Sequence, residues 1–302
     1  MSGFSPEWLA QREPLDAAAR DAGLAHEFAA AIARTPRRII DLGAGTGANL
    51  RLLAPLIAGD QDWLLIDKDP ALLVAQRREI ARWAAQHEWG FSEDATGAVE
   101  ISVGAARWRV RSQELDLHAS LEQLRLQDCD GVTTTAFLDL VSVEWIDRLC
   151  HMLSRSPRPL LATLSVDGQR RWQPAMADDL RLLQAFEQHQ AGDKGFGIAL
   201  GIAAVDEMAL RLARNGFSVG TARSDWLIAD EHRALLGQMI DEALAIGCEL
   251  EPGAASEFAQ WAAHRHAQVA AGTLALTIGH RDLLALPRPI VYPDSFTLPA
   301  AR

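Results

Sequence analysis

Three glycines at alternate positions follow an acidic residue in the stretch IDLGAGTG, from Ile40 to Gly47. Glycine adopts positive φ angles without a steric penalty, and its lack of a side chain lets another group approach the backbone closely. The stretch 38–42, in which three of five residues are apolar, predicts a short buried strand before these glycines, and a helical pattern follows from about 49 to 57. A strand, a glycine turn and a helix in this order predict a turn that holds a small ligand.

Two ligand chemistries fit such a turn, and the nearby residues distinguish them. Gly43, Gly45 and Ala48 satisfy the loose fingerprint of a dinucleotide site, in which the turn holds a pyrophosphate. Asp41 opposes this interpretation, because its carboxylate would repel a pyrophosphate but can face the ammonium of the methionine moiety of S-adenosylmethionine. Gly47 supplies a third glycine, which suits close backbone approach to a small zwitterion. The residues therefore favour S-adenosylmethionine over a nicotinamide dinucleotide.

Short apolar segments alternate with helical patterns along the chain. Five strands that alternate with helices predict a parallel, doubly wound sheet, because each parallel crossover needs a covering helix. The ligand of such a sheet lies at the carboxyl ends of the strands, near the first strand. Strands are expected at 38–42, at 63–66, in a segment ending at 115–116, at 131–137 and at 159–166, with two later strands at 217–228 and 273–284.

The stretch from Ile40 to Gly47 resembles the first motif of the class I S-adenosylmethionine-dependent methyltransferases, and the order of motifs continues the resemblance over about residues 36–166. The two late strands suit the sixth and seventh strands of that family. The resemblance implies an α/β fold with a doubly wound, seven-stranded Rossmann-like sheet, mostly parallel with an antiparallel last strand. It also implies a single methyltransferase domain over residues 1–302, with S-adenosylmethionine as the cofactor.

The resemblance assigns cofactor contacts to residues that end the second and third strands. Asp67 stands where the family binds the ribose hydroxyls, and a carboxylate accepts two neighbouring O–H donors well. Asp67 could instead cap the helix that begins near Pro70, since Asp is a good N-cap. Asp116 stands where the family meets the adenine amino group, with Leu115 packed on the ring. The alternative for Asp116 is an exposed residue at a strand end.

Residues just after the fourth strand are expected near the sulfonium group. The resemblance offers Thr135, Ala136, Phe137 and Asp139 in the stretch TTTAFLDLV, and we assign Thr135 to the cofactor site. The ranking of the other three stays open at this point.

Residues 1–36 are expected to form a helical N-terminal cap that covers the cofactor. The residue before a proline is steered away from the helical region, so Pro14 predicts a helix boundary near Arg12. Arg12 and Arg20 could each bind the cofactor carboxylate through a bidentate contact, and Arg12 is favoured. The alternative is an amphipathic helix whose arginines are solvated.

Two further segments are expected to be added to the plain sheet. Residues 86–110 predict a hairpin insertion, because apolar residues alternate on both sides of a Gly-Ala-Ala turn. Residues 168–200 follow the fifth strand and are expected to form a lid over the acceptor. If the acceptor must lose a proton, His189 is the first candidate for the general base and Asp193 the second. The alternatives are a solvated helix end and a transfer that needs positioning alone.

Composition limits the partners of the protein. The net charge is −11, so a broad nucleic-acid surface, which needs clustered Lys and Arg, is not expected. No apolar run approaches about 18 residues, which argues against a membrane span, and the N-terminus lacks the pattern of a signal peptide. The three well-separated cysteines fit reduced thiols in a cytoplasmic protein, and no metal site is expected.

Together these patterns predict a cytoplasmic methyltransferase that acts on a small-molecule acceptor. A nucleic-acid methyltransferase is the nearest alternative enzyme. A catalytically silent protein that binds S-adenosylmethionine or a partner protein is the alternative from a different class. The sequence indicates neither the identity of the acceptor nor the oligomeric state.

Overall fold

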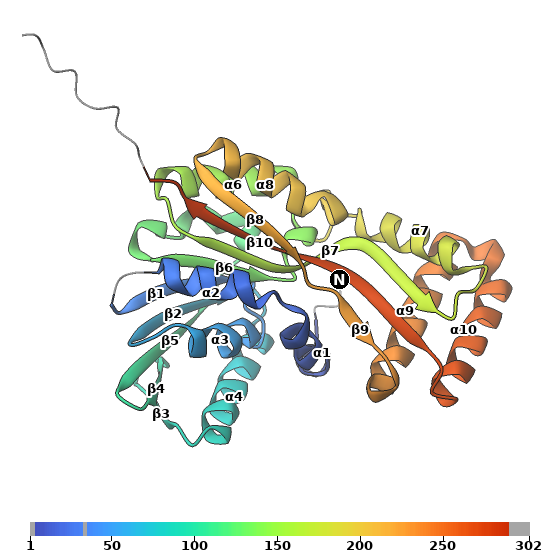
Figure 1. Cartoon of the computed structure of the whole chain (residues 1–302), viewed down its shortest axis with the longest axis horizontal. Helices are drawn as coiled ribbons and strands as arrows, with labels where there is room; N and C mark the ends of the chain where they lie inside the picture. Colours follow the sequence, from blue (N-terminus) through green and yellow to red (C-terminus); the bar gives the residue numbers. More distant parts are fainter. Residues whose placement is uncertain (1–3, 33–34, 290–302) are drawn as a thin grey trace, which may run out of the picture.

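A mixed ten-stranded sheet runs through the computed structural model, which describes residues 4–32 and 35–289 (Figure 1). Its seven principal strands are β1 (Arg37–Leu42), β2 (Gln61–Asp67), β5 (Ala106–Glu114), β6 (Gly131–Thr135), β7 (Leu160–Gln173), β8 (Phe217–Arg223) and β10 (Ala275–Pro287). Five of them lie parallel in the order β5-β2-β1-β6-β7. β10 follows β7 and pairs antiparallel with β7 on one side and β8 on the other.

This order confirms the expected doubly wound sheet with an antiparallel last strand. The dinucleotide-binding sheet has the strand order 3-2-1-4-5-6. Here the last strand of the chain, β10, is inserted between β7 and β8, the fifth and sixth of the expected strands. The structure contains more strands than the seven expected, because β3 (Gly90–Glu93), β4 (Val99–Val103) and β9 (Trp226–Ile228) join the same sheet.

Helices cover both faces of the parallel strands, as crossovers between parallel strands require. One face packs against α2 (Ala22–Ala31), α3 (Ala48–Leu53) and α4 (Pro70–Gln86), and the other against α6 (Val143–Arg155) and α8 (Ala204–Arg214). Neighbouring residues of β2 point to opposite faces, so Leu65 joins the first of these cores and Ile66 the second. Within residues 4–32 and 35–289, no helix is both long and apolar enough to cross a membrane.

Residues 86–110, where a hairpin insertion is expected, include β3, β4 and the first part of β5. β4 pairs antiparallel with both of these strands. Val99 and Ile101 point inward from β4 and are buried with Trp108 and Val110 of β5. The same stretch of β5 also pairs with β2. The hairpin is therefore merged with the third parallel strand and widens the sheet.

β7 is longer than the strand expected at 159–166, and it carries the sheet beyond the other parallel strands. It continues to Gln173 because Arg170 and Trp172 alternate inward and are buried, and β10 pairs with it over this extension. The helices α7 (Asp179–Gln190), α9 (Arg233–Leu250) and α10 (Ala255–Ala270) pack there around a third apolar core (Figure 1). Within the expected lid, residues 168–173 therefore lie in a strand of the sheet.

The N-terminal residues form two helices, α1 (Pro6–Ala19) and α2. α1 runs through Pro14, so the helix boundary predicted there is wrong. Arg12 and Asp16 form an ion pair across this proline, one helical turn apart, which supports the helix on both sides of it. The chain turns instead just before Asp21, whose side chain caps α2.

Candidate active site

The glycine turn connects β1 to α3 at the carboxyl edge of the sheet. Gly43, Gly45 and Gly47 have φ angles of +67°, +52° and +80°, in the left-handed region that favours glycine. Each of the three glycines is therefore required by the backbone itself, before any ligand is considered. The turn lies where β1 ends, which is where the fold places a ligand.

Asp41 is a fully buried carboxylate at the end of β1. Its Oδ1 accepts hydrogen bonds from Asn49 Nδ2 and Thr133 Oγ1, both at 2.8 Å. Its Oδ2 is buried without a hydrogen-bond partner among the described residues. Burial raises the pKa of Asp41 to about 6, against the opposing effect of the two hydrogen bonds. An unpartnered carboxylate oxygen in such a place is suited to a cationic donor.

Thr133 and Asn49 were not identified from the sequence as parts of this site. Thr133 lies opposite Asp41 in the register between β6 and β1. That register depends on how the two strands align, so it could not be read from either strand alone. Asn49 lies in the first turn of α3, and no local pattern indicated that its side chain would reach Asp41.

Asp67 connects the end of β2 to the glycine turn. Its Oδ2 accepts a hydrogen bond from Gly45 N at 2.8 Å, and its Oδ1 accepts one from Asp69 N at 3.0 Å. The N-cap of α4 is Asp69, whose side chain accepts from Ala71 N. The alternative in which Asp67 caps that helix is therefore wrong. Each oxygen of Asp67 keeps a further lone pair that a hydroxyl group can use.

Leu115 and Asp116 follow β5 beside Asp67. The backbone N–H of Leu115 donates to the carbonyl of Asp67 at 3.0 Å, and its half-buried side chain packs against the core. Asp116 is exposed and caps α5 (Leu117–Ser120), accepting from His118 N at 2.8 Å. The exposure agrees with the alternative of a strand-end residue, and a contact of Asp116 with adenine stays a prediction.

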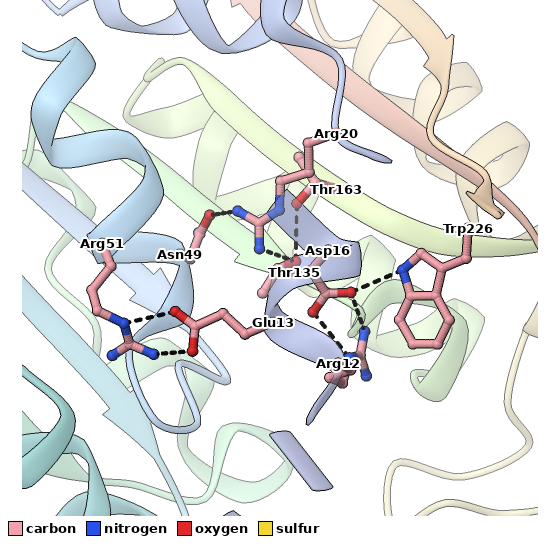
Figure 2. Close-up of polar contacts among 9 residues, drawn as sticks. All are labelled: Arg12, Glu13, Asp16, Arg20, Asn49, Arg51, Thr135, Thr163 and Trp226. Atoms are coloured by element: carbon pink, nitrogen blue, oxygen red, sulfur yellow. Dashed lines mark hydrogen bonds and ion pairs between the residues drawn. The ribbon is translucent and has the colours of Figure 1, made fainter. Parts of the chain in front are cut away.

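Arg20 reaches the strand ends from the N-terminal cap (Figure 2). Its Nη1 donates to Asn49 Oδ1 at 2.6 Å and its Nη2 to Thr135 Oγ1 at 3.0 Å. Thr135 also accepts from Thr163 Oγ1 at 3.0 Å, so it joins β6, β7 and the cap. Arg20 is buried, and its Nε has no partner among the described residues.

Arg12, the arginine that the sequence favours, has other partners. Its Nε and Nη2 donate to the Asp16 carboxylate at 3.0 and 3.2 Å. Its guanidinium lies 5.0 Å from the ring centroid of Trp226, whose Nε1 also donates to Asp16 (Figure 2). Binding of a cofactor carboxylate by Arg12 therefore stays a prediction. Arg20 is the arginine that the structure brings to Thr135.

α1 lies across the glycine turn through a few side chains. A Cβ built on Gly45 would meet Leu9 Cδ1 at 3.1 Å, so this leucine lies directly on the turn. Glu13 forms an ion pair with Arg51 of α3, with Nε and Oε1 2.7 Å apart (Figure 2). A cavity of about 360 Å³ lies between α1, α3 and α4 beside this ion pair. The cap therefore covers the turn without filling the space beside it.

Phe137 lies against the turn from the other side. A Cβ built on Gly43 would approach Phe137 Cδ2 to 2.7 Å, which a real side chain could not do. The aromatic ring thus requires glycine at this position, in addition to the positive φ. Phe137, one of the four residues that the sequence offered near the sulfonium group, is therefore in contact with the turn.

Asp139 is a second buried carboxylate with an unpartnered oxygen. It lies in the short helix η4 (Leu138–Leu140) after β6, and its Oδ1 has no partner among the described residues. Burial raises the pKa of Asp139 to about 6, while the charge of Arg12 opposes this shift. Ala136, between β6 and η4, has a φ of +48°, a strained conformation for a residue with a side chain. A carboxylate that titrates near neutral pH can accept a proton from a substrate.

His189 and Asp193 lie at and after the end of α7. The carbonyl of His189 accepts from Lys194 Nζ at 2.9 Å, and its side chain is half-buried. Asp193 is exposed, and its Oδ1 accepts from Gly195 N at 2.6 Å and Gly197 N at 3.1 Å. These bonds shape the loop after α7. The proposed roles of both residues as general bases stay predictions.

No protein-family model and no curated protein matches this sequence. Among solved structures, phosphoethanolamine N-methyltransferase 2 of Haemonchus contortus has a TM-score of 0.47 at 10% identity, covering 95% of this chain and 58% of that chain. A cyclopropane-fatty-acyl-phospholipid synthase-like protein of Lactobacillus casei has a TM-score of 0.47 at 14% identity, covering 94% of each chain. A SAM-dependent methyltransferase of Geobacter sulfurreducens, in complex with S-adenosyl-L-homocysteine, has a TM-score of 0.43 at 13% identity, covering 95% and 100%.

This chain thus spans 58% of the length of the Haemonchus enzyme. At TM-scores of 0.43–0.47 and identities of 10–14%, these similarities do not carry a functional assignment. A functional assignment must be argued from the strand order and from the residues at the strand ends. The observed sheet is the doubly wound sheet with an antiparallel last strand that the resemblance to the class I S-adenosylmethionine-dependent methyltransferases implies.

Replacing Asp139 by Asn should stabilise the protein near neutral pH. The folded state raises the pKa of Asp139 from 3.8 to about 6, so between these values it binds more protons than the unfolded state. Stability is therefore lost as the pH rises through this window. Asp139→Asn should unfold with a free energy roughly 1–3 kcal/mol higher than the wild type at about pH 7.5, and with little difference at about pH 3.5, below the unfolded pKa. Urea unfolding at both pH values measures this, and an equal difference at both would contradict it.

Proposed function

We propose that this protein is a class I S-adenosylmethionine-dependent methyltransferase that acts on a small-molecule acceptor in the cytoplasm. One observation carries the proposal. Oδ2 of Asp41 is a buried carboxylate oxygen without a partner among the described residues, and it lies beside a turn of glycines at positive φ. Such an oxygen suits the ammonium of an amino-acid moiety and would repel a pyrophosphate. When bound, S-adenosylmethionine supplies an electrophilic methyl group on a sulfonium ion.

The residues at the strand ends fit the parts of this cofactor. Asp67 and Asp41 end the neighbouring strands β2 and β1, and Thr135 ends β6 on the other side of β1. In the proposal, Asp41 faces the ammonium, Asp67 the ribose hydroxyls and Thr135 the sulfonium region. Arg20 is the better candidate for the cofactor carboxylate, because Arg12 is already paired with an aspartate.

The acceptor is proposed to be a small molecule. The net charge of −11 gives no support for binding the phosphates of a nucleic acid. Methyl transfer is a displacement at the sulfonium carbon, so alignment and exclusion of water contribute much of the rate. Leu9 of α1 and Phe137 after β6 lie on the turn and would exclude water from this edge.

The cofactor assignment is tested by calorimetry with S-adenosylhomocysteine, NAD and NADP. Only S-adenosylhomocysteine should bind the wild type. Gly45→Val should abolish this binding, because Gly45 has a φ of +52° and an added Cβ would press on Leu9 and on the ligand. Gly104→Val is the matched control: Gly104 has a φ of +58° with nothing within 4 Å of an added Cβ.

The far-UV circular dichroism of both glycine variants should remain near that of the wild type. Binding of a nicotinamide dinucleotide in place of S-adenosylhomocysteine would overturn the assignment. Unchanged affinity for S-adenosylhomocysteine in Gly45→Val would show that the turn does not hold the ligand.

The affinity for S-adenosylhomocysteine should fall in acid. The pKa of Asp41 is about 6 without ligand, and an ammonium beside Oδ2 favours the ionised form. Below about pH 6, protonation of Asp41 competes with binding, so the dissociation constant should rise by up to about tenfold per pH unit. Asp41→Asn should bind more weakly at about pH 7.5 and show a flatter pH dependence. Adenosine, which lacks the amino-acid moiety, is the control ligand, and an unchanged slope in Asp41→Asn would refute this role.

The search for a general base needs the acceptor first, through a screen of metabolites for release of S-adenosylhomocysteine. If a base is used, removing it should lower turnover by about two to four orders of magnitude. The sequence places His189 first and Asp193 second, and the structure adds Asp139 because of its unpartnered oxygen. His189→Ala, Asp193→Asn and Asp139→Asn are compared on the same acceptor. Full turnover in all three would support a transfer that depends on positioning alone.

A further inference from the structure

The loop between α7 and η5 (Gly201–Ala203) turns one aromatic side chain inward, that of Phe196. This side chain is only 6% exposed and belongs to the core around β6. The loop has a defined form. Asp193 Oδ1 accepts from two backbone N–H groups of the loop, and the backbones of Asp193 and Ile198 form an antiparallel β-bridge across it. Leu200 N donates to the carbonyl of Val141 at 2.9 Å, which anchors the far end of the loop beside η4.

Phe196 lies among residues that follow three different strands. The ammonium of Lys68, the residue after Asp67, is 5.7 Å from the centroid of the Phe196 ring. The ring of His118, two residues after Asp116, is 5.8 Å away between centroids, and that of Phe137 is 5.3 Å away. The loop therefore carries Phe196 to the carboxyl ends of β2, β5 and β6, where the cofactor is proposed to bind.

Among the aromatic neighbours of Phe196 that the structure describes, none stacks on its ring, and a lysine side chain lies over the ring. The rings of His118, Phe137 and Trp145 meet it at 88°, 85° and 87°, so none of these three stacks parallel to it. The ammonium of Lys68 lies over the ring, and Lys68 is itself exposed. An exposed lysine side chain can swing away at small cost, since its charge remains in water. A purine that replaced it would gain stacking with the phenyl ring.

We propose that Phe196 stacks on the adenine ring of the cofactor, so that the loop after α7 binds the cofactor as well as bordering the acceptor. This inference rests on the proposed function, because it takes the cofactor to be an adenine nucleoside. It makes Phe196 a binding residue for adenine.

The test compares dissociation constants for S-adenosylhomocysteine and for adenosine by calorimetry. Phe196→Leu keeps an apolar side chain but removes the aromatic face, and it should weaken both ligands by a similar factor of about ten or more. Phe196→Tyr keeps the face and should bind within about threefold of the wild type. Ile198→Ala is the matched control in the same loop, because Ile198 is 78% exposed, and it should change neither constant.

Equal affinities of Phe196→Leu and the wild type, with similar thermal midpoints, would overturn the inference and leave the proposed function intact. Failure of the wild type itself to bind either ligand would instead remove the proposed function, and this inference with it. If Phe196→Leu does not fold, the wild type labelled at phenylalanine decides. The ring signals of Phe196 are the ones missing from the spectrum of Phe196→Tyr. Nuclear Overhauser effects from the adenine protons to these signals support the stack, and their absence overturns it.

Discussion

A buried guanidinium holds the N-terminal cap against the carboxyl edge of the sheet. Arg20 donates to Asn49 and Thr135, and Asn49 donates in turn to Asp41, so one chain of hydrogen bonds joins the cap to three elements, α3, β6 and β1. A cation removed from water is costly unless its donors are satisfied and carboxylates lie nearby. These partners come together only when α1 lies across the strand ends. The helix that covers the glycine turn therefore also brings this buried charge to its hydrogen-bond acceptors.

The same edge concentrates features that reduce the stability of the fold. Asp41 and Asp139 each keep a buried oxygen without a partner among the described residues, and burial raises the pKa of both. Ala136 and Leu164, close to the ends of β6 and of the shared part of β7, have positive φ angles. Strain and unsatisfied polar groups persist where the surrounding structure enforces them, and they cluster at functional sites. Their position here is independent of any similarity to other proteins.

The alternation of strands and helices along the chain and the nature of the turn could be predicted from the sequence, because both depend on local patterns. Apolar runs between helical patterns indicated the parallel sheet, and the glycines indicated the turn after β1. The expectations that were wrong were also local. Pro14 predicted a helix boundary, yet the ion pair of Arg12 and Asp16 spans it within α1. β7 continued past its expected end because β10 pairs along the extension, and no pattern within β7 could indicate its partner.

What the sequence by itself determined is the turn and its acidic residues. Gly43, Gly45 and Asp67 contact residues of the turn or of the adjoining strand. Their types and spacing in the sequence therefore suffice to predict most of the turn. The tertiary structure alone decided which arginine reaches the strand ends and which aromatic ring lies beside them. Arg20 and its partner Thr135 are 115 positions apart. Such contacts depend on how helices and loops pack after the sheet has formed, and the free energy that selects them is shared among many distant residues.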